Sequence, residues 1–382
     1  MTGHIPGATV LRRLPFESVV VSPGSNHVAL RAANERLVLS LIRSHGELSK
    51  AQIAELSGLT AQTASVISRS LIEAGLLIAG NPVRGRVGQP YVPLRLNPQG
   101  AMFFGLHVGT KKACLALVDF TGHVITETSV ARGTANLSDV IAFARQAVEE
   151  IRTGFNSERN ARIQGLGASI ASGALRMGSD PASWLEIDDA FAAFGQDIGV
   201  TTYVSNDAVA ACSAEQIYGL GGGLSDFVYV FVDESVSGGL VHDGRIHFSR
   251  DGSGANLGKV LVPNADAKMV PLRSLASVVR KKKLLSKDLE LLARGIAFAT
   301  YSASAVVSYS AVIVDGAISS EYISRLCALL RTLLGEIDGR SSTPLIVREG
   351  SHTRKAAALG AACLPLADRF YPEAPSNRSS SD

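Results

Sequence analysis

The chain has 382 residues, of which 46% are hydrophobic and 19% are charged, a composition typical of a globular rather than a disordered protein. This length exceeds what one ordinary hydrophobic core holds, so we expect more than one domain. The net charge is only +3, but the first hundred residues hold ten Lys and Arg against five Glu. The basic excess therefore lies at the amino-terminal end, which indicates a nucleic-acid partner for that end and not for the rest.

The sequence indicates neither a membrane nor a secretory route. No apolar run reaches the roughly 18 residues that cross a bilayer, and no apolar leader precedes a small-residue cleavage site. We therefore expect a cytoplasmic protein with no membrane partner. Four cysteines lie scattered in apolar segments, which predicts core packing rather than metal or redox chemistry: Cys114, Cys212, Cys327 and Cys363.

Three short helices are expected after a proline-containing flexible arm at residues 1–30. Each should begin at a polar residue able to cap it, namely Asn34, Ser49 and Thr60. Gly58 tolerates the left-handed conformation and should end the second helix. This arrangement predicts a helix-turn-helix, the motif that places its last helix in the major groove of DNA.

The third helix has two different faces. Ala64, Ile67, Leu71 and Ala74 recur at helical spacing and should face the core. The opposite face is then free to meet base edges. The residues expected to contact DNA from this helix are Gln62, Thr63, Ser65 and Arg69.

A β-hairpin is expected next, with strands at residues 76–79 and 91–96. Its tip carries Arg84 and Arg86 among glycines, so that the backbone can approach a phosphate while the arginines supply positive charge. Together with the three helices it predicts a DNA-binding winged helix over residues 31–98. A winged helix that docks only on protein is the alternative.

Residues 99–375 alternate between strands and helices, which predicts an α/β fold. Two three-stranded meanders, near residues 102–130 and 227–248, are each followed by alternating helices and strands. This repeat indicates a duplicated pair of lobes with a cleft between them. Residues 376–382 are expected to form a disordered tail.

Several motifs resemble those of the ROK family of repressors and sugar kinases. They are Leu71–Leu76, the wing and linker at 84–98, Val118–Gly122, Asn206–Ala211, Ser237–Val241, Val314–Gly316 and Ala358–Ala362. The resemblance extends from Asn34 to Leu364. It implies a winged helix joined to a ligand-binding and oligomerisation body with an actin-like, RNase H-like two-lobe fold.

The resemblance also implies a carbohydrate in the interlobe cleft. The family aspartate at the position of Asp207 contacts the sugar, and in the kinases it is the general base. A helix N-cap without a ligand is the alternative for Asp207, and a solvated surface position is the alternative for Asn256 and Lys259. The expected ligand-binding residues are Ser172, Gly173, Asn206, Asp207, Asn256 and Lys259.

Three departures from the family kinases argue against catalysis. The first phosphate loop, His107–Thr110, lacks the family's acidic residue and one of its paired glycines. The second holds Asp233 and Glu234 in place of a Gly-Thr-Gly run, and carboxylates repel a polyphosphate. Residues 253–283 contain neither Cys nor His for a zinc site. We therefore expect no catalytic residue, no metal and no cofactor.

The sequence thus predicts a DNA-binding transcriptional regulator, a repressor of sugar uptake or catabolism genes that responds to a small carbohydrate. Because helix-turn-helix proteins bind paired half-sites, a homodimer or homotetramer is expected. One alternative is a sugar kinase with an accessory DNA-binding domain. Another is a regulator whose body only oligomerises.

Overall fold

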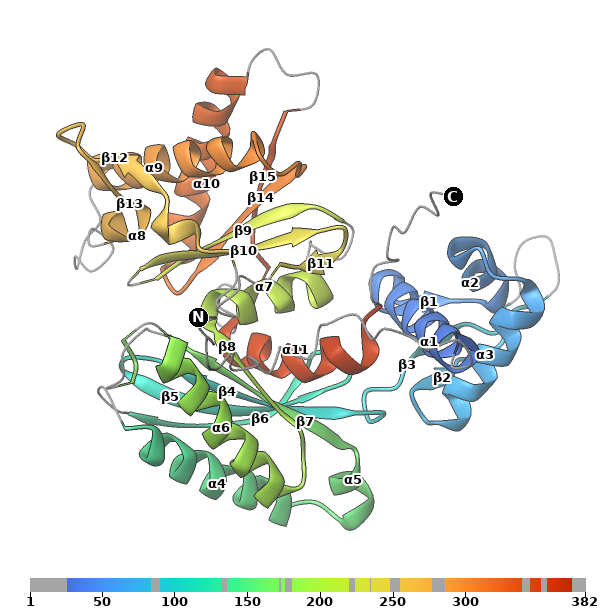
Figure 1. The fold of residues 1–382 in the computed structure, drawn as a ribbon. Coiled ribbons are helices and arrows are strands. Elements are labelled where there is room, and N and C mark those ends of the chain that lie inside the picture. The colour runs from blue at the N-terminus through green and yellow to red at the C-terminus, as the bar shows by residue number, and fades with distance from the viewer. Residues whose placement is uncertain are drawn as a thin grey trace, which may run out of the picture.

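The computed structural model describes a winged helix and two α/β lobes (Figure 1). The described residues are 26–83, 90–131, 136–171, 173–175, 181–219, 224–233, 235–247, 255–276, 286–338, 344–351 and 356–372. Arg84, Arg86 and Ser172 lie outside these ranges, so the predictions made for them stay predictions.

The winged helix consists of three helices and a small sheet. They are α1 (Asn26–His45), α2 (Lys50–Ser57) and α3 (Ala61–Glu73), with β1 (Glu47–Leu48), β2 (Leu77–Ala79) and β3 (Leu94–Leu96) in the order β1-β3-β2. The expected cap Asn34 is wrong, because α1 begins at Asn26 and residues 26–30 belong to the helix rather than to a flexible arm. Residues 26–30 contain no glycine or proline, and Ala29 and Leu30 favour helix.

Lobe I is built on a five-stranded sheet in the order β6-β5-β4-β7-β8. Its strands are β4 (Met102–Val108), β5 (Lys112–Asp119), β6 (Val124–Ala131), β7 (Ile163–Ile170) and β8 (Thr202–Asn206). The first three form an antiparallel meander, and β7 and β8 run parallel to β4. The helices α4 (Leu137–Thr153) and α6 (Pro181–Ile198) cover one face, and the short α5 (Ser157–Ala161) precedes β7.

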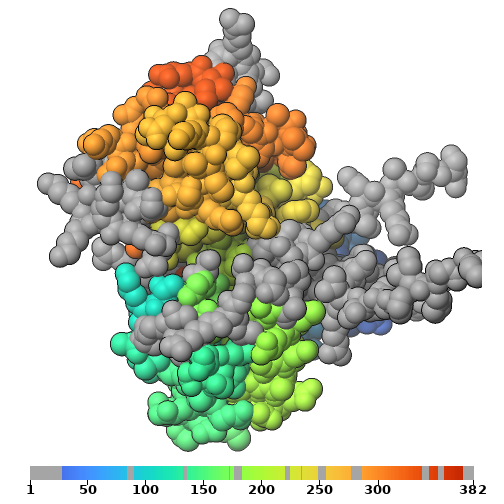
Figure 2. Space-filling model, turned by 60° about the vertical axis from the view of Figure 1, so that its left-hand side comes forward, coloured from blue at the N-terminus to red at the C-terminus, as the bar shows by residue number. Residues whose placement is uncertain are grey.

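Lobe II repeats this topology, with the strand order β11-β10-β9-β14-β15. Its strands are β9 (Phe227–Val232), β10 (Val236–His242), β11 (Arg245–Ile246), β14 (Ala311–Gly316) and β15 (Ile346–Glu349), and its large helices are α9 (Ser286–Ser304) and α10 (Ser320–Asp338). The predicted duplication is confirmed, and Figure 2 shows the two lobes one above the other. The sequence did not predict a small insertion after β11: η2 (Leu257–Lys259), β12 (Leu261–Pro263), β13 (Met269–Pro271) and α8 (Leu272–Leu275).

Two helices lie between the lobes, α7 (Asp207–Tyr218) and α11 (Ala356–Phe370) (Figure 1). Glycines allow α11 to approach both the sheet and α7: a Cβ at Gly167 of β7 would lie 1.7 Å from the carbonyl oxygen of Ala361, and one at Gly360 of α11 would lie 2.1 Å from that of Ala210 in α7. The same α7–α11 pair therefore packs against lobe I and continues toward lobe II. None of the helices in the described ranges combines the length and hydropathy that a membrane-spanning helix requires.

Candidate DNA-binding and ligand sites

The turn between α2 and α3 is fixed by local capping, as expected. The Ser49 hydroxyl accepts a hydrogen bond from the Gln52 amide, and the Gln52 side chain accepts one from the Ser49 amide, which completes a capping box. Gly58 ends α2 with φ 68°, and the Thr60 hydroxyl caps α3 through the Thr63 amide. These bonds set the angle at which α3 leaves the turn.

The inward face of α3 is formed by Ala64, Ile67 and Leu71, each less than 5% exposed. Ser68 is also buried there, because its hydroxyl donates to the Ala64 carbonyl within the same helix. The prediction that Ala74 faces the core is wrong. Since the helix ends at Glu73, Ala74 is its C-cap and is exposed.

The outer face of α3 carries the residues predicted to contact DNA. Gln62 and Arg69 are exposed, whereas Thr63 and Ser65 are half-buried. Thr63 lies within hydrogen-bonding distance of Thr60, 2.9 Å between the hydroxyl oxygens, so its hydroxyl takes part in the cap. Of these four predicted contacts, Gln62 and Arg69 are thus the more open to a partner.

The base of the wing is formed as predicted, although its strands are shorter. The strand β2 pairs with β3, and an isolated bridge joins Val83 to Tyr91 further toward the tip. β1 adds a third strand that the sequence did not predict.

The second candidate site lies where β8 ends and α7 begins. The Asn206 side chain, rather than that of Asp207, caps α7 by accepting the Val209 amide at 2.8 Å. Asp207 is the first residue of the helix, and its carboxylate accepts the Ala208 amide. Asn206 rather than Asp207 is therefore the N-cap of α7, but the Asp207 carboxylate also bonds to the first turn of the helix, so its role in ligand binding stays a prediction.

A carboxylate from the other lobe lies near Asp207. Asp233 follows β9 in lobe II. Burial, and after it the negative charge of Asp233, raise the pKa of Asp207 to about 7, against the lowering effect of backbone hydrogen bonds. The junction of the lobes therefore brings together two acidic groups that repel when both are ionised.

A row of polar residues crosses the lobe I sheet beside this junction. His107, Ser169 and Ser205 are register partners on β4, β7 and β8. The His107 Nδ1 lies 3.0 Å from the Ser169 hydroxyl, which in turn lies 3.2 Å from the Ala357 carbonyl of α11. Burial, and after it the positive charge of Lys112, lower the pKa of His107 to about 4, so the imidazole is neutral at pH 7. The sequence located His107 in the degenerate phosphate loop but did not predict this network.

The remaining predicted ligand residues are more exposed. Gly173 has φ 77° and open space around its Cα. Asn256 caps η2 and Lys259 is its last residue, and Gly258 of η2 packs closely against the Val236 carbonyl at the start of β10. They therefore lie on the lobe II segment next to the turn that carries Asp233.

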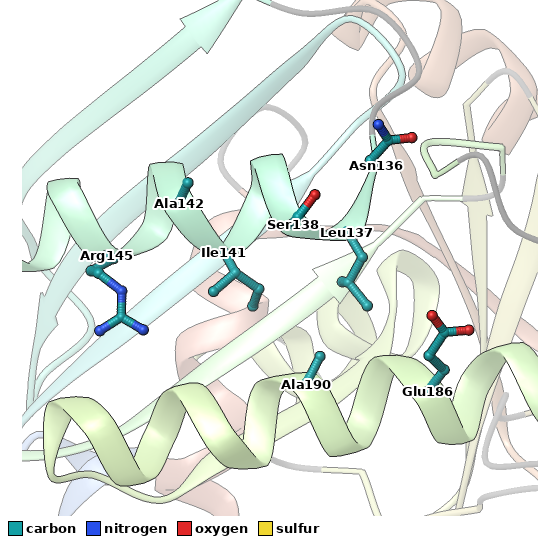
Figure 3. Close-up of a pocket in the computed structure, with 8 residues that line it drawn as sticks. All are labelled: Asn136, Leu137, Ser138, Ile141, Ala142, Arg145, Glu186 and Ala190. Atoms are coloured by element: carbon teal, nitrogen blue, oxygen red, sulfur yellow. The ribbon is translucent and has the colours of Figure 1, made fainter.

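A hollow of about 640 Å³ lies elsewhere on lobe I, between α4 and α6 (Figure 3). Its walls include Leu137, Ile141 and Ala190, with Arg145 and Glu186 as charged groups. Arg145 is already paired with Asp197 at 2.6 Å. Among the residues that line it in the described ranges there is none of the predicted ligand-binding residues.

A group with metal-ligating side chains lies on the surface of lobe II. Asp226, His242 and Asp243 place their ligand atoms within 4.8 Å of one another. The His242 ring and Asp226 form a 2.8 Å pair, and Asp226 also accepts the Asp243 amide. These bonds explain the group as a structural feature that holds the β10–β11 turn. This turn lies at the opposite end of β10 from Val236.

Comparison with known proteins shows which families this architecture resembles. A model of the ROK family matches residues 103–270, and a winged helix-turn-helix DNA-binding model matches residues 31–78. An uncharacterized protein, y4fQ of Sinorhizobium fredii, is 25% identical over 375 residues, 91% of this chain and 94% of that protein. A putative xylose repressor of Caldicellulosiruptor sp. is 23% identical over 243 residues, 62% of this chain and 60% of the repressor.

Among solved structures, a ROK family transcriptional regulator described as a homologue of the Escherichia coli MLC protein superposes with a TM-score of 0.65. It is 19% identical in sequence, and the match covers 89% of this chain and 98% of that one. The fold and its amino-terminal domain therefore define a winged helix-turn-helix protein with a two-lobed, sugar-kinase-like body. Residues 103–270 match the ROK family and residues 31–78 match a winged helix-turn-helix DNA-binding domain, so the chain is similar to the DNA-binding transcriptional regulators of the ROK family.

Proposed function

We propose that the protein is a repressor of sugar uptake or catabolism genes whose operator binding responds to a small carbohydrate at the junction of the lobes. The observation that carries the proposal is the open outer face of α3, with Gln62 and Arg69 exposed beside the base of a wing. A recognition helix meets base edges in this way, and phosphate contacts from the wing set its register. Arg84 and Arg86 are the proposed wing contacts.

Binding to an operator is tested by selecting duplex sites from a random library and titrating them against the protein. Replacing Arg84 and Arg86 with Ala should weaken binding to every sequence and flatten the salt slope by about one unit per lost phosphate contact. Gln62→Ala should instead mainly relax sequence preference. A wing variant that binds as tightly as wild type at all salt concentrations would remove the wing from the interface.

The carbohydrate site is proposed around Asn206 and Asp207, with Ser172, Gly173, Asn256 and Lys259 as further contacts. The Asp207 carboxylate, beside the Asn206 amide and a second acidic group, suits a ligand rich in hydroxyl donors. Thermal-shift screening against a sugar panel that includes xylose tests this, since a ligand at about 100 times its Kd stabilises by about 2.7 kcal/mol. Asp207→Ala should abolish the shift.

Phosphoryl transfer is the alternative function, and two features oppose it. Asp233 stands after β9 where a nucleotide phosphate would need backbone amides, and its charge already raises the pKa of Asp207. The neutral His107 is held by Ser169 instead of offering a positive charge. We expect no ATP-dependent phosphorylation of any hexose, pentose or amino sugar, and a phosphorylated product lost in Asp207→Asn would restore the kinase interpretation.

A further inference from the structure

The winged helix is joined to lobe I by more than the linker, because the two domains share one hydrophobic core. One continuous apolar cluster contains Ile42 and Leu71 of the winged helix together with Phe103, Phe120 and Leu366 of the body. The linker adds a bond, since the Asn97 side-chain amide donates to the Gly75 carbonyl just after α3. The orientation of the DNA-binding domain is therefore a property of this junction.

Arg43 of α1 lies at the centre of the junction. Its guanidinium carbon lies 4.8 Å from the centroid of the Phe120 ring and 5.0 Å from that of the Tyr218 ring. One of its nitrogens, Nη1, donates to the Phe120 carbonyl at 2.7 Å. A planar cation between two aromatic rings, with a directed hydrogen bond, has few alternative positions. Although Arg43 contributes to the basic charge of the amino-terminal region, it faces the body and not DNA.

The surroundings of Arg43 are shaped to hold this arrangement. Gly122 has φ 92°, and a Cβ there would lie 2.9 Å from the Tyr218 ring, so the turn after β5 fits closely under the ring. On the other side, Phe370 of α11 meets Phe120 edge to face at 5.0 Å. A second arginine, Arg162 of lobe I, donates to the Ala74 carbonyl at 3.0 Å and so fixes the end of α3 itself.

Tyr218 gives the junction a connection to the proposed ligand site. It is the last residue of α7, the helix whose first residue is Asp207 and whose cap is Asn206. Ten residues of α7 between these ends are buried, which favours movement of the helix as a rigid unit. A displacement of the first turn of α7 therefore also displaces the Tyr218 ring that contacts Arg43.

We propose that Arg43 is a positioning residue for DNA recognition, one that ties the orientation of the winged helix to helix α7 through Tyr218 and Phe120. Its role in recognition rests on the proposed function, whereas the physical tie does not. Loss of the guanidinium should free the winged helix to sample several orientations on the body. The winged helix would still make its contacts within one DNA half-site, but its orientation relative to the body would no longer be fixed.

The tie can be measured without DNA or ligand, by the distance between two spin labels. All four native cysteines are buried, and burial raises the pKa of the Cys114 and Cys327 thiols to about 12, so introduced cysteines can be labelled selectively. Glu55→Cys on α2 and Glu149→Cys on α4 place one label on each domain at exposed positions. Diluting labelled with unlabelled protein removes distances between copies.

Wild type should give one narrow distance distribution, and Arg43→Gln should broaden it at least two-fold. Tyr218→Leu alters the junction from the α7 side and should also broaden the distance distribution. This second variant keeps the test decisive if Arg43→Gln folds poorly. Arg31→Gln is the matched control, because Arg31 lies on the same helix but bonds to Glu35 and Ser70 within the winged helix. Equally narrow distributions in wild type, Arg43→Gln and Tyr218→Leu would overturn the proposal.

A DNA titration then separates positioning from direct contact. With sites selected by wild type, Arg43→Gln should lower affinity several-fold while the dependence of affinity on salt stays the same. A salt slope flattened by about one unit would identify Arg43 as a phosphate contact and overturn the positioning role. If wild type binds no DNA, the proposed function fails, but the spin-label distances still decide whether Arg43 holds the two domains together.

Discussion

The acidic pair at the junction of the lobes predicts an unusual pH dependence of stability, testable with Asp207→Asn. The pKa of Asp207 is raised to about 7 in the folded protein from an ordinary value of 3.8, first by burial and then by Asp233. The folded state therefore holds the Asp207 proton more tightly than the unfolded state does. The contribution of this group to stability is fully present below about pH 4, falls as the pH rises toward 7, and stays lost above 7.

The size of the effect follows from the same pKa difference. It corresponds to at most about 4 kcal/mol, and to less if water reaches the partly exposed carboxylate. Asn keeps the acceptor for the Ala208 amide but carries no charge. The Asp207→Asn protein should therefore unfold several degrees higher than wild type at pH 8, and this advantage should shrink steadily toward pH 5.

Thermal unfolding of both proteins from pH 5 to pH 8.5 measures this difference directly. Asp139→Asn is a matched control, because Asp139 is an exposed carboxylate in the first turn of α4. It should show no such trend. A constant difference between Asp207→Asn and wild type across the pH range would refute the reasoning, since it would mean that Asp207 titrates alike in the folded and unfolded states.

Three further predictions concern packing and capping. Ser49→Ala removes the capping box and should destabilise the winged helix by about 1 kcal/mol in urea titrations, with a loss of DNA binding no larger than the loss of folded protein. Gly167→Ala puts a Cβ 1.7 Å from the Ala361 carbonyl and should sharply lower the midpoint temperature of unfolding. The control is Gly335→Ala in α10, where the added Cβ meets open space and should leave the midpoint unchanged. Equal midpoints in the two variants would argue against the α11 contact. The four native cysteines should resist a thiol reagent at pH 8 until the protein is unfolded, and rapid modification of any one would contradict its burial.

Much of the fold follows from local signals in the sequence. The caps Ser49 and Thr60 and the terminating Gly58 act within a few residues, so the helix-turn-helix was predicted closely. The two meanders were predicted because buried strands differ strongly in composition from the turns between them. The boundary of α1 was not, because several polar residues suit a cap and the sequence alone does not say which of them the chain uses.

The site was harder to predict because it depends on contacts between distant segments. The Asn206–Asp207 pair was recognised from its resemblance to a family motif, but only the fold reveals that Asn206 is the cap and that Asp233 of the other lobe acts on Asp207. Arg43 was counted with the basic residues of the DNA-binding end, since nothing local distinguishes it. Its partners, Phe120 and Tyr218, lie 77 or more residues away along the chain.

The central claim is that this regulator releases its operator when a carbohydrate occupies the junction of the lobes. The most direct test is fluorescence anisotropy of a selected operator, titrated with wild type and with Asp207→Ala in the presence and absence of the sugar that gives the largest thermal shift. We predict that the sugar weakens operator binding by wild type at least ten-fold, that it has no effect on Asp207→Ala, and that the two proteins bind the operator equally well without sugar. An operator affinity that no sugar in the panel changes, or an equal response in Asp207→Ala, would contradict the account.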